Sequence, residues 1–263
     1  MMGYKLTGKP SPCDACGIAK AKRAQVPKTT HVKATAPAER LFVDTTGPIP
    51  DVTLKFKYLF GAVDDYSGKL FMMFGQNKNV LVKFVAEAFD RFEGEKKQMK
   101  YLRMDGGGEN VAVKDLCNKR GVEVEQTPPY TPQYNGRIER RFPIVISMAM
   151  ALLWSTGFTK EMKNKLFGEA VTTAAFLHDL GPTVRNPVSA EELWSGKASK
   201  WTGKFLVEFG RVGMVTVKST KPGKLQDKSE PMIMVGYAKE YPAGTYKFWN
   251  PKTKRIIVSD SVQ

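Results

Sequence analysis

Three acidic residues stand where a carboxylate can be presented to a bound molecule. Asp44 and Asp105 each follow a short run typical of a β-strand, Leu41–Val43 and Tyr101–Met104, and Glu139 falls in the first turn of a predicted helix. Carboxylates on rigid elements suit hard divalent cations such as Mg²⁺, which takes oxygen ligands and keeps several waters. A single acid is more often a solvated charge or a helix-dipole partner, but three in such positions predict a shared metal site.

The elements that position these acids are predicted to form a mixed α/β domain. Apolar residues recur every three or four positions from Leu81 to Phe92, which predicts a helix packed on a sheet. A second helix, Val113–Lys119, ends before Gly121, a residue suited to a left-handed C′ position. The order βββαβαβ predicts an antiparallel meander that is then extended by two more strands. The five strands are expected at 41–43, 58–63, 70–74, 101–104 and 122–125.

Composition excludes several classes of protein. A hydrophobic content of 42% and an aromatic content of 11% allow a real core and argue against global disorder. The longest strongly apolar run, Pro143–Trp154, is too short to span a bilayer, and no charged-then-apolar leader follows Met1. Three cysteines exclude a disulfide-built scaffold, so we expect a reducing intracellular compartment.

Positive charge gathers at the two ends of the chain. The net charge of +15 divides into +6 for residues 1–40, +2 for residues 41–199 and +7 for residues 200–263. Phosphate backbones are the usual partners of such arms, because each Lys or Arg contact releases condensed counterions. Simple solubility, or an anionic membrane surface, is the alternative.

Cys13 and Cys16 form a CxxC within a segment that has no hydrophobic period. Two thiolates at this spacing can bind zinc, but a tetrahedral site needs four ligands, and the only nearby histidine is His31. Half of a zinc site and incidental thiols both remain open. A thioredoxin-like role is disfavoured, because no strand precedes the motif.

Four segments, in chain order, resemble the integrase of Ty1/copia-type LTR retrotransposons, a relative of retroviral integrases. They are Phe42–Pro48, Val63–Ser67, Leu102–Glu109 and Thr131–Arg140. The last, Thr-Pro-Gln-Tyr-Asn-Gly-Arg-Ile-Glu-Arg, is the most specific. The resemblance continues through Asn186–Lys197 and into an SH3-like tail, so that it covers nearly the whole chain.

The resemblance implies an RNase H-like core whose D,D,E triad falls on Asp44, Asp105 and Glu139, acting as catalytic residues and as ligands of two Mg²⁺ or Mn²⁺ ions. It implies DNA integration: phosphoryl transfer that processes donor DNA ends and joins them to a target duplex. A polyprotein origin, a homo-multimer on DNA and no membrane partner are expected. The expected localisation is a cytoplasmic particle first and then the nucleus, where the integration step would take place.

The loop before Glu139 and the helix that carries it are predicted to touch DNA. Amide side chains can donate to and accept from DNA, a glycine gives hinge freedom, and arginines three apart on a helix can reach phosphates. An ordinary solvated helix face is the alternative for the arginines. The expected contacts are Gln133, Asn135, Gly136, Arg137 and Arg140.

We expect three domains: a basic linker with a remnant zinc-binding module (1–36), the catalytic core with trailing helices (37–198) and an SH3-like β domain (199–263). Strands of the last are predicted at 211–218, 232–237, 245–249 and 255–259, in a small barrel. Its aromatic residues are expected to fill the barrel rather than to stack on bases. They are Tyr237, Tyr246, Phe248 and Trp249.

Several departures from the family pattern matter. The two zinc-binding histidines that precede the CxxC in the family are not in this chain, so Cys13 and Cys16 are predicted to hold no complete zinc site. Pro143 is expected to kink or restart the helix after Glu139, where the family continues polar and basic. Asp64, in another family motif, is expected to cap a turn rather than to bind metal.

Two functional interpretations of the sequence remain open. The three intact acids favour an active DNA-joining enzyme. The missing zinc ligands and Pro143 favour a catalytically weak transposon remnant that still binds DNA or assembles with partners. A different RNase H-like nuclease is less well supported, because of the SH3-like tail.

Overall fold

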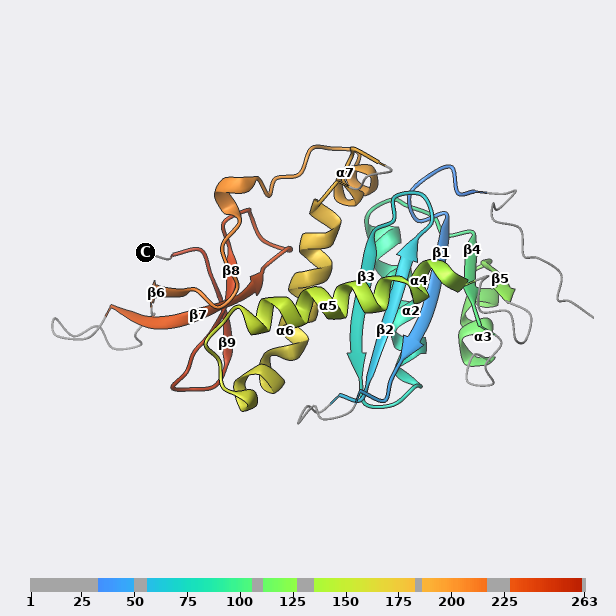
Figure 1. Ribbon diagram of the computed structural model, residues 1–263. Helices are drawn as coiled ribbons and strands as arrows, with labels where there is room; N and C mark the ends of the chain where they lie inside the picture. The colour runs from blue at the N-terminus through green and yellow to red at the C-terminus, as the bar shows by residue number, and fades with distance from the viewer. Residues whose placement is uncertain are drawn as a thin grey trace, which may run out of the picture. The chain divides into compact units, whose positions relative to one another are not determined.

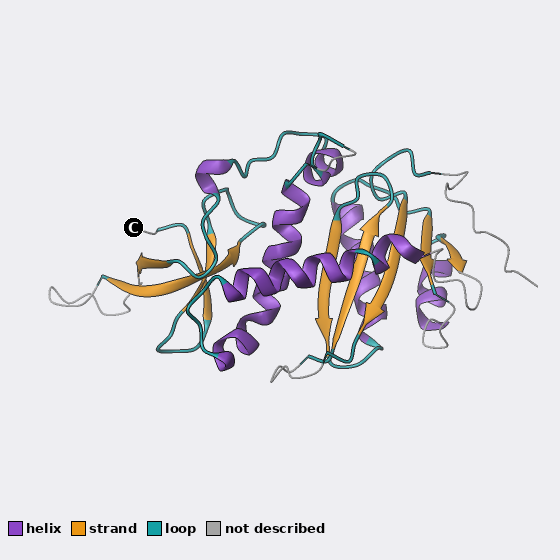
Figure 2. Cartoon of the chain, viewed as in Figure 1, coloured by secondary structure: helices purple, strands orange, loops and turns teal. Residues whose placement is uncertain are grey.

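The computed structural model describes residues 33–49, 56–105, 111–126, 135–182, 186–216 and 228–261. Lys33–Gln263 form one compact unit, which Figures 1 and 2 show as a five-stranded sheet, a set of helices and a second sheet. Cys13, Cys16 and Gln133 lie outside the described residues, so the expectations for zinc and for Gln133 stay predictions.

The first sheet has the order β3-β2-β1-β4-β5. Its strands are β1 (Arg40–Thr46), β2 (Tyr58–Asp64), β3 (Leu70–Gly75), β4 (Tyr101–Met104) and β5 (Glu123–Gln126). β1, β2 and β3 pair antiparallel, whereas β4 pairs parallel with β1 and β5 parallel with β4. The predicted mixed five-stranded sheet with an antiparallel meander is therefore confirmed.

Helices cover both faces of this sheet. They are α2 (Val80–Gly94), α3 (Val111–Lys119), α4 (Gly136–Glu139), α5 (Arg141–Trp154), α6 (Lys160–Leu180) and α7 (Ala190–Ser195). Because side chains alternate along a strand, Leu41 and Val43 of β1 pack with α2, whereas Phe42 packs with α4, α5 and α6. In the part of the chain that the structure describes, no helix is both long and apolar enough to cross a membrane.

Helix α7 closes the α2 side of the core. Ser189 and Glu192 form a capping box at its start, and Gly196 ends it in the left-handed conformation with φ of 67°. Between them Trp194 packs edge-on against Phe71, with ring centroids 5.2 Å apart. This part of Asn186–Lys197, a range in which the sequence resembles the family, therefore contributes to core packing.

The second sheet is antiparallel with the order β6-β7-β8-β9. Its strands are β6 (Val212–Thr216), β7 (Ser229–Tyr237), β8 (Tyr246–Trp249) and β9 (Ile256–Ser259), joined to the core through a short 3₁₀ turn, η3 (Gly203–Phe205). Tyr237, Phe248 and Trp249 are buried and Tyr246 is partly buried, as predicted. The described residues form a four-stranded sheet, where the sequence predicted a small barrel.

The second sheet shares a hydrophobic core with α6. Val235 and Trp249 belong to the same buried cluster as the inner face of α6. The Thr173 hydroxyl donates to the Val235 carbonyl at 3.2 Å, and the Phe176 ring lies 4.7 Å from that of Tyr237. The predicted boundary between residues 198 and 199 lies in the segment between α7 and η3, and the division into domains stays a prediction.

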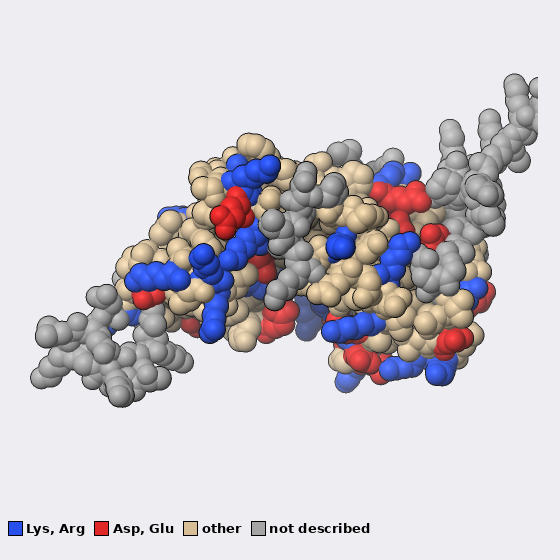
Figure 3. All heavy atoms as spheres, turned by 90° about the horizontal axis from the view of Figure 1, so that it is seen from below, with Lys and Arg blue, Asp and Glu red and all other residues tan. Residues whose placement is uncertain are grey.

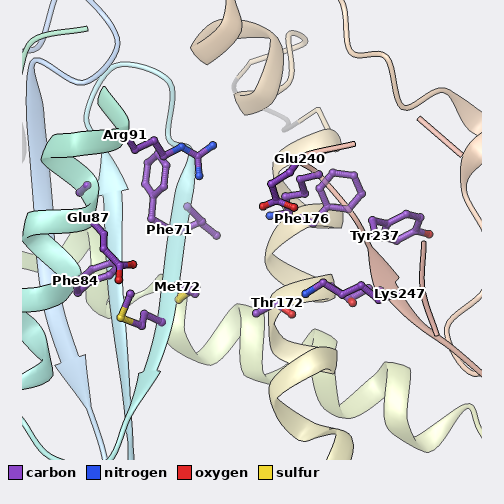
Figure 4. Close-up of a pocket in the computed structure, with 16 residues that line it drawn as sticks. Phe71, Met72, Phe84, Glu87, Arg91, Thr172, Phe176, Tyr237, Glu240 and Lys247 are labelled. Carbon is purple, nitrogen blue, oxygen red and sulfur yellow. The ribbon is translucent and has the colours of Figure 1, made fainter. Parts of the chain in front are cut away.

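A cavity of about 420 Å³ opens where the two parts meet, between β3 and α2 on one side and α6 and β7 on the other (Figure 4). Arg91 and Glu87 reach it from α2, and Lys247 and Glu240 from the second sheet. Lys247 is paired with Glu169 of α6 at 3.3 Å. The cavity is lined by neither Asp44, Asp105 nor Glu139.

Replacing Phe176 with Ala should destabilise both sheets together. Removing a buried aromatic ring from a shared core costs about 3–5 kcal/mol, and a single cooperative unit loses all its structure in one transition. Urea unfolding followed by circular dichroism and by tryptophan fluorescence should give coincident curves shifted to lower urea. Leu206→Ala, at a side chain that is 42% exposed, should shift them little. Two separated transitions would mean that the sheets fold independently.

Candidate active site

Parallel pairing of β1 with β4 places two of the predicted acids side by side. This ladder ends with the pair Phe42 and Arg103, and Asp44 and Asp105 each lie two residues further along. Paired strands run about 4.8 Å apart, and residues two positions on share a face. Asp44 and Asp105 accordingly line one small cavity of about 60 Å³.

Glu139 is brought to this region by an amide that is buried against β1. Asn135, only 1% exposed, donates its Nδ2 to the Val43 carbonyl at 3.0 Å, one residue before Asp44. Helix α4 begins at the next residue, and its Ile138 is fully buried in the core. Glu139 follows as a partly exposed side chain at the end of α4.

The electrostatics show that the three carboxylates act on one another. Burial raises the pKa of Asp44 to about 6, and the charges of Asp105 and Glu139 add to the rise, although the Thr45 N–H donates to its Oδ1 at 2.8 Å. Burial also raises the pKa of Glu139, with Asp105 adding to it and Arg140 opposing it. A bound cation would lower the pKa values of such carboxyl groups, because its positive charge stabilises their ionised forms.

The donor chemistry fits a hard divalent cation. All three candidate ligands offer carboxylate oxygens, and Asp44 and Asp105 are already adjacent. Within the described ranges, however, no three His, Cys, Asp or Glu side chains are gathered closely enough to hold a metal ion. Asp44 and Asp105, which line one cavity, are the residues that would hold such an ion, and Glu139 is the third candidate.

The predicted DNA-contacting residues fall into different surroundings. Asn135 is buried and holds the loop to β1, and Gly136 adopts helical backbone at which a Cβ would make only ordinary contacts, so no hinge is required there. Arg137 is paired with Asp65, whereas Arg140 is exposed beside Glu139. Arg140 is thus the arginine most open to a phosphate, and DNA contact stays a prediction for the whole set.

Asp64 caps a turn, as predicted. It is fully buried, and its carboxylate accepts from the N–H and hydroxyl of Ser67, each at 2.7 Å, and from the Ala38 N–H at 2.8 Å. Burial raises the pKa of Asp64, and these hydrogen bonds oppose the rise. The turn that it fixes also holds Asp65, the partner of Arg137.

The helix breaks after Glu139, as Pro143 predicts. α4 ends at Glu139 and α5 begins at Arg141, so Pro143 lies in the first turn of α5, where its missing N–H is harmless. The outward side of α5 carries exposed apolar side chains instead of charges. They are Ile144, Met150 and Trp154, the last of which is 67% exposed.

One residue near the acids was missed by the sequence reasoning. Lys78, just before α2, lines the same small cavity as Asp44 and Asp105. Only the tertiary fold brings this end of α2 to the ends of β1 and β4. A lysine in a basic chain carries no local signal that could have marked it.

The comparisons with known proteins agree with this architecture. Residues 212–263 match the family model described as the retroviral polymerase SH3-like domain. The whole chain is 29% identical to part of the retrovirus-related Pol polyprotein from transposon TNT 1-94 of Nicotiana tabacum. It covers 19% of that polyprotein, and spans about a fifth of the length of the curated relatives it matches.

Among solved structures, the chain is similar to one in a simian T-cell lymphotropic virus intasome bound to PP2A regulatory subunit B56 gamma, with a TM-score of 0.53 at 14% identity. That match covers 90% of this chain and 81% of the other, and so shows a common fold. The catalytic core domain of BIV integrase also matches, at 16% identity and a TM-score of 0.44, over 60% of this chain and 93% of that one.

The expected resemblance and fold class are confirmed: the chain is similar to part of retrovirus-related Pol polyproteins, and a mixed five-stranded sheet with flanking helices precedes an SH3-like unit. In this chain the two strand-end aspartates occupy neighbouring strands, and the glutamate sits on a separate short helix.

Replacing Asp44 with Asn should stabilise the metal-free protein. Because folding raises the pKa of Asp44 from 3.8 to about 6, the ionised side chain destabilises the fold at pH 7, and this penalty fades as the pH falls from about 6 to about 4. We expect a gain of about 1–2 kcal/mol at pH 7 that vanishes near pH 4. Urea unfolding at both pH values measures it.

Mg²⁺ should stabilise the wild type more than the Asp44→Asn variant, because the cation relieves the same repulsion. Asp115→Asn, at an exposed residue of α3, is the matched control. It should change neither the stability at pH 7 nor the stabilisation by Mg²⁺. Equal stability of wild type and Asp44→Asn at pH 7 would contradict the repulsion at this site.

Proposed function

We propose that this chain performs DNA integration by metal-dependent phosphoryl transfer, processing donor DNA ends and joining them to a target duplex. The observation that carries the proposal is the adjacency of Asp44 and Asp105, with Glu139 close enough to raise the pKa of Asp44. Support comes from the similarity to Pol polyproteins and from the fold shared with an intasome chain. A homo-multimer on DNA, in the nucleus after a cytoplasmic particle stage, belongs to the same proposal.

In this proposal two bound Mg²⁺ or Mn²⁺ ions supply polarisation of the scissile phosphate and of the attacking hydroxyl or water. The chain's own residues do the rest. Asp44 and Asp105 present oxygens from the rigid ends of β1 and β4, and Glu139 presents a third from α4. Arg140, exposed beside Glu139, and Lys78, in the wall of the acid cavity, can bind the DNA phosphates.

The second sheet offers a basic surface for the rest of the DNA. On the face seen in Figure 3, several Lys and Arg side chains lie over this part, whereas positively and negatively charged side chains are mixed over the first sheet. The turn between β8 and β9 is held rigid by Asn250, whose Oδ1 accepts from the N–H groups of Lys252 and Thr253 at 2.9 and 3.1 Å. The exposed Lys252, Lys254 and Arg255 project from this ordered turn.

A catalytically weak remnant that binds DNA or assembles with partners is the second candidate. Two observations favour it: the described acids do not form a three-ligand metal-binding group, and α5 turns apolar side chains outward where the family continues polar and basic. A joining assay separates the two candidates.

Glu139→Gln and Asp105→Asn should each lower DNA joining by at least a hundredfold while leaving duplex affinity within about threefold, since each removes a metal ligand but no phosphate contact. The measurement is strand transfer of short donor duplexes into a plasmid with Mg²⁺ or Mn²⁺. Glu123→Gln and Asp115→Asn, at exposed positions on β5 and α3, are the isosteric controls. Joining that survives either site variant would refute the catalytic assignment, and a wild type that binds but never joins would favour the remnant.

Changing Lys252, Lys254 and Arg255 together to Gln should flatten the salt dependence of duplex binding. Each lost phosphate contact removes about 0.9 from the slope of log affinity against log salt, so the slope should fall by about 2–3. The matched triple variant takes Lys83, Lys119 and Arg120, exposed residues of the nearly neutral middle of the chain. Equal slopes for the two triple variants would show that the β8–β9 turn is not a preferred DNA contact.

A further inference from the structure

The segment that carries Glu139 is attached to the fold on both sides of that residue. Arg137 pairs with Asp65 of the β2–β3 turn, and Arg141 contacts the His178 ring of α6, with its guanidinium nitrogen 2.9 Å from Nε2. These arginines lie two positions before and two after Glu139. At about 100° per residue both point roughly away from the glutamate on a helical turn. The arginines therefore face the protein while Glu139 faces the acid site.

The contact with Arg141 fixes the protonation of the His178 ring. An arginine has donors only, so Nε2 must accept and Nδ1 must carry the ring proton. Nδ1 lies 3.7 Å from Oδ1 of Asp179, the next residue of α6. Nδ1 itself makes no hydrogen bond to a described residue, so Asp179 acts on the ring by its charge at this distance.

Asp179 ties this arrangement to the sheet. It is 2% exposed, and both of its oxygens accept from the Leu70 N–H at 3.2 Å. Leu70 begins β3, the outer strand of the sheet, where an N–H would otherwise face no neighbouring strand. A buried carboxylate is tolerated only when it is hydrogen-bonded, so Asp179 has a firm position.

Arg141 is a half-buried cation that needs partners. Burial lowers the pKa of its guanidinium, the charge of Asp179 opposes this, and the charges of Arg137 and Arg140 lower the pKa further. The two arginines that flank Glu139 each have a partner in the fold. Asp65 holds the first of them, and the His178 ring, backed by Asp179, holds the other.

We propose that His178 is a positioning residue that sets the place of Glu139 through Arg141, with Asp179, which is bound to Leu70 of β3, facing the other side of the ring. The inference rests on the proposed DNA-joining function. Only Arg140, in helical backbone, separates α4 from α5, so a contact that holds Arg141 also constrains Glu139 two residues earlier.

The test compares His178→Leu, which removes the acceptor, with His178→Gln, whose side-chain oxygen can accept from Arg141 at nearly the same place. Hydrogen exchange of the full chain, without metal or DNA, reports the 135–142 segment directly. Exchange there should be at least fivefold faster in His178→Leu and within twofold of wild type in His178→Gln. In the joining assay, His178→Leu should raise the Mg²⁺ concentration for half-maximal rate by about tenfold, as loss of a ligand-orienting group does, and His178→Gln should restore it.

Val171→Ala, in the buried face of α6 but outside this contact, controls for simple loss of stability. It should lower the melting temperature without changing either the exchange of 135–142 or the Mg²⁺ requirement. The proposal is overturned if His178→Leu matches wild type in exchange, or if His178→Gln is as impaired as His178→Leu. Exchange needs no activity, so failure of the proposed function, seen as joining by Glu139→Gln, stays distinguishable from failure of the tether.

Discussion

The parallel pairing of β1 with β4 is the constraint on which the site depends. It fixes Asp44 beside Asp105 through backbone hydrogen bonds that are indifferent to side-chain charge. The sheet holds these two carboxylates together, and burial raises the pKa of Asp44 to about 6, with the charges of Asp105 and Glu139 adding to the rise. Backbone pairing thus keeps Asp44 in a place that disfavours its ionised form.

The rest of the core neutralises its charges internally. Arg40, nearly buried in β1, lies 2.9 Å from Glu125 and 3.6 Å from Asp65, and Asp65 also meets Arg137. Residues 41–199 accordingly carry a net charge of only +2 out of +15, and residues 200–263 carry +7. Within this nearly neutral part, Asp44 and Asp105 bring two acids together at the ends of β1 and β4.

The sequence was sufficient where the signal was local or periodic. Alternation and turn residues predicted β1 to β5 within two or three residues, and Pro143 predicted the break between α4 and α5. It was insufficient where a contact joins distant segments: the burial of Asn135 against Val43, the capture of Arg137 by Asp65, and Lys78 beside the aspartates. The merging of the second sheet with α6 was missed for the same reason, since Val235 reads as an ordinary strand residue.

Glu139 is held by side-chain contacts around it, whereas the two aspartates are held by the sheet. Pairing of β1 with β4 fixes Asp44 and Asp105, and Glu139 ends the four-residue α4, one residue before α5 begins. Asn135 and Ile138 anchor the base of α4 to the core, and Arg137 and Arg141 contact Asp65 and His178 on either side of Glu139. The position of the third acid therefore depends on contacts with β1, the β2–β3 turn and α6, which come from distant parts of the chain, whereas the adjacency of the two aspartates follows from backbone pairing alone.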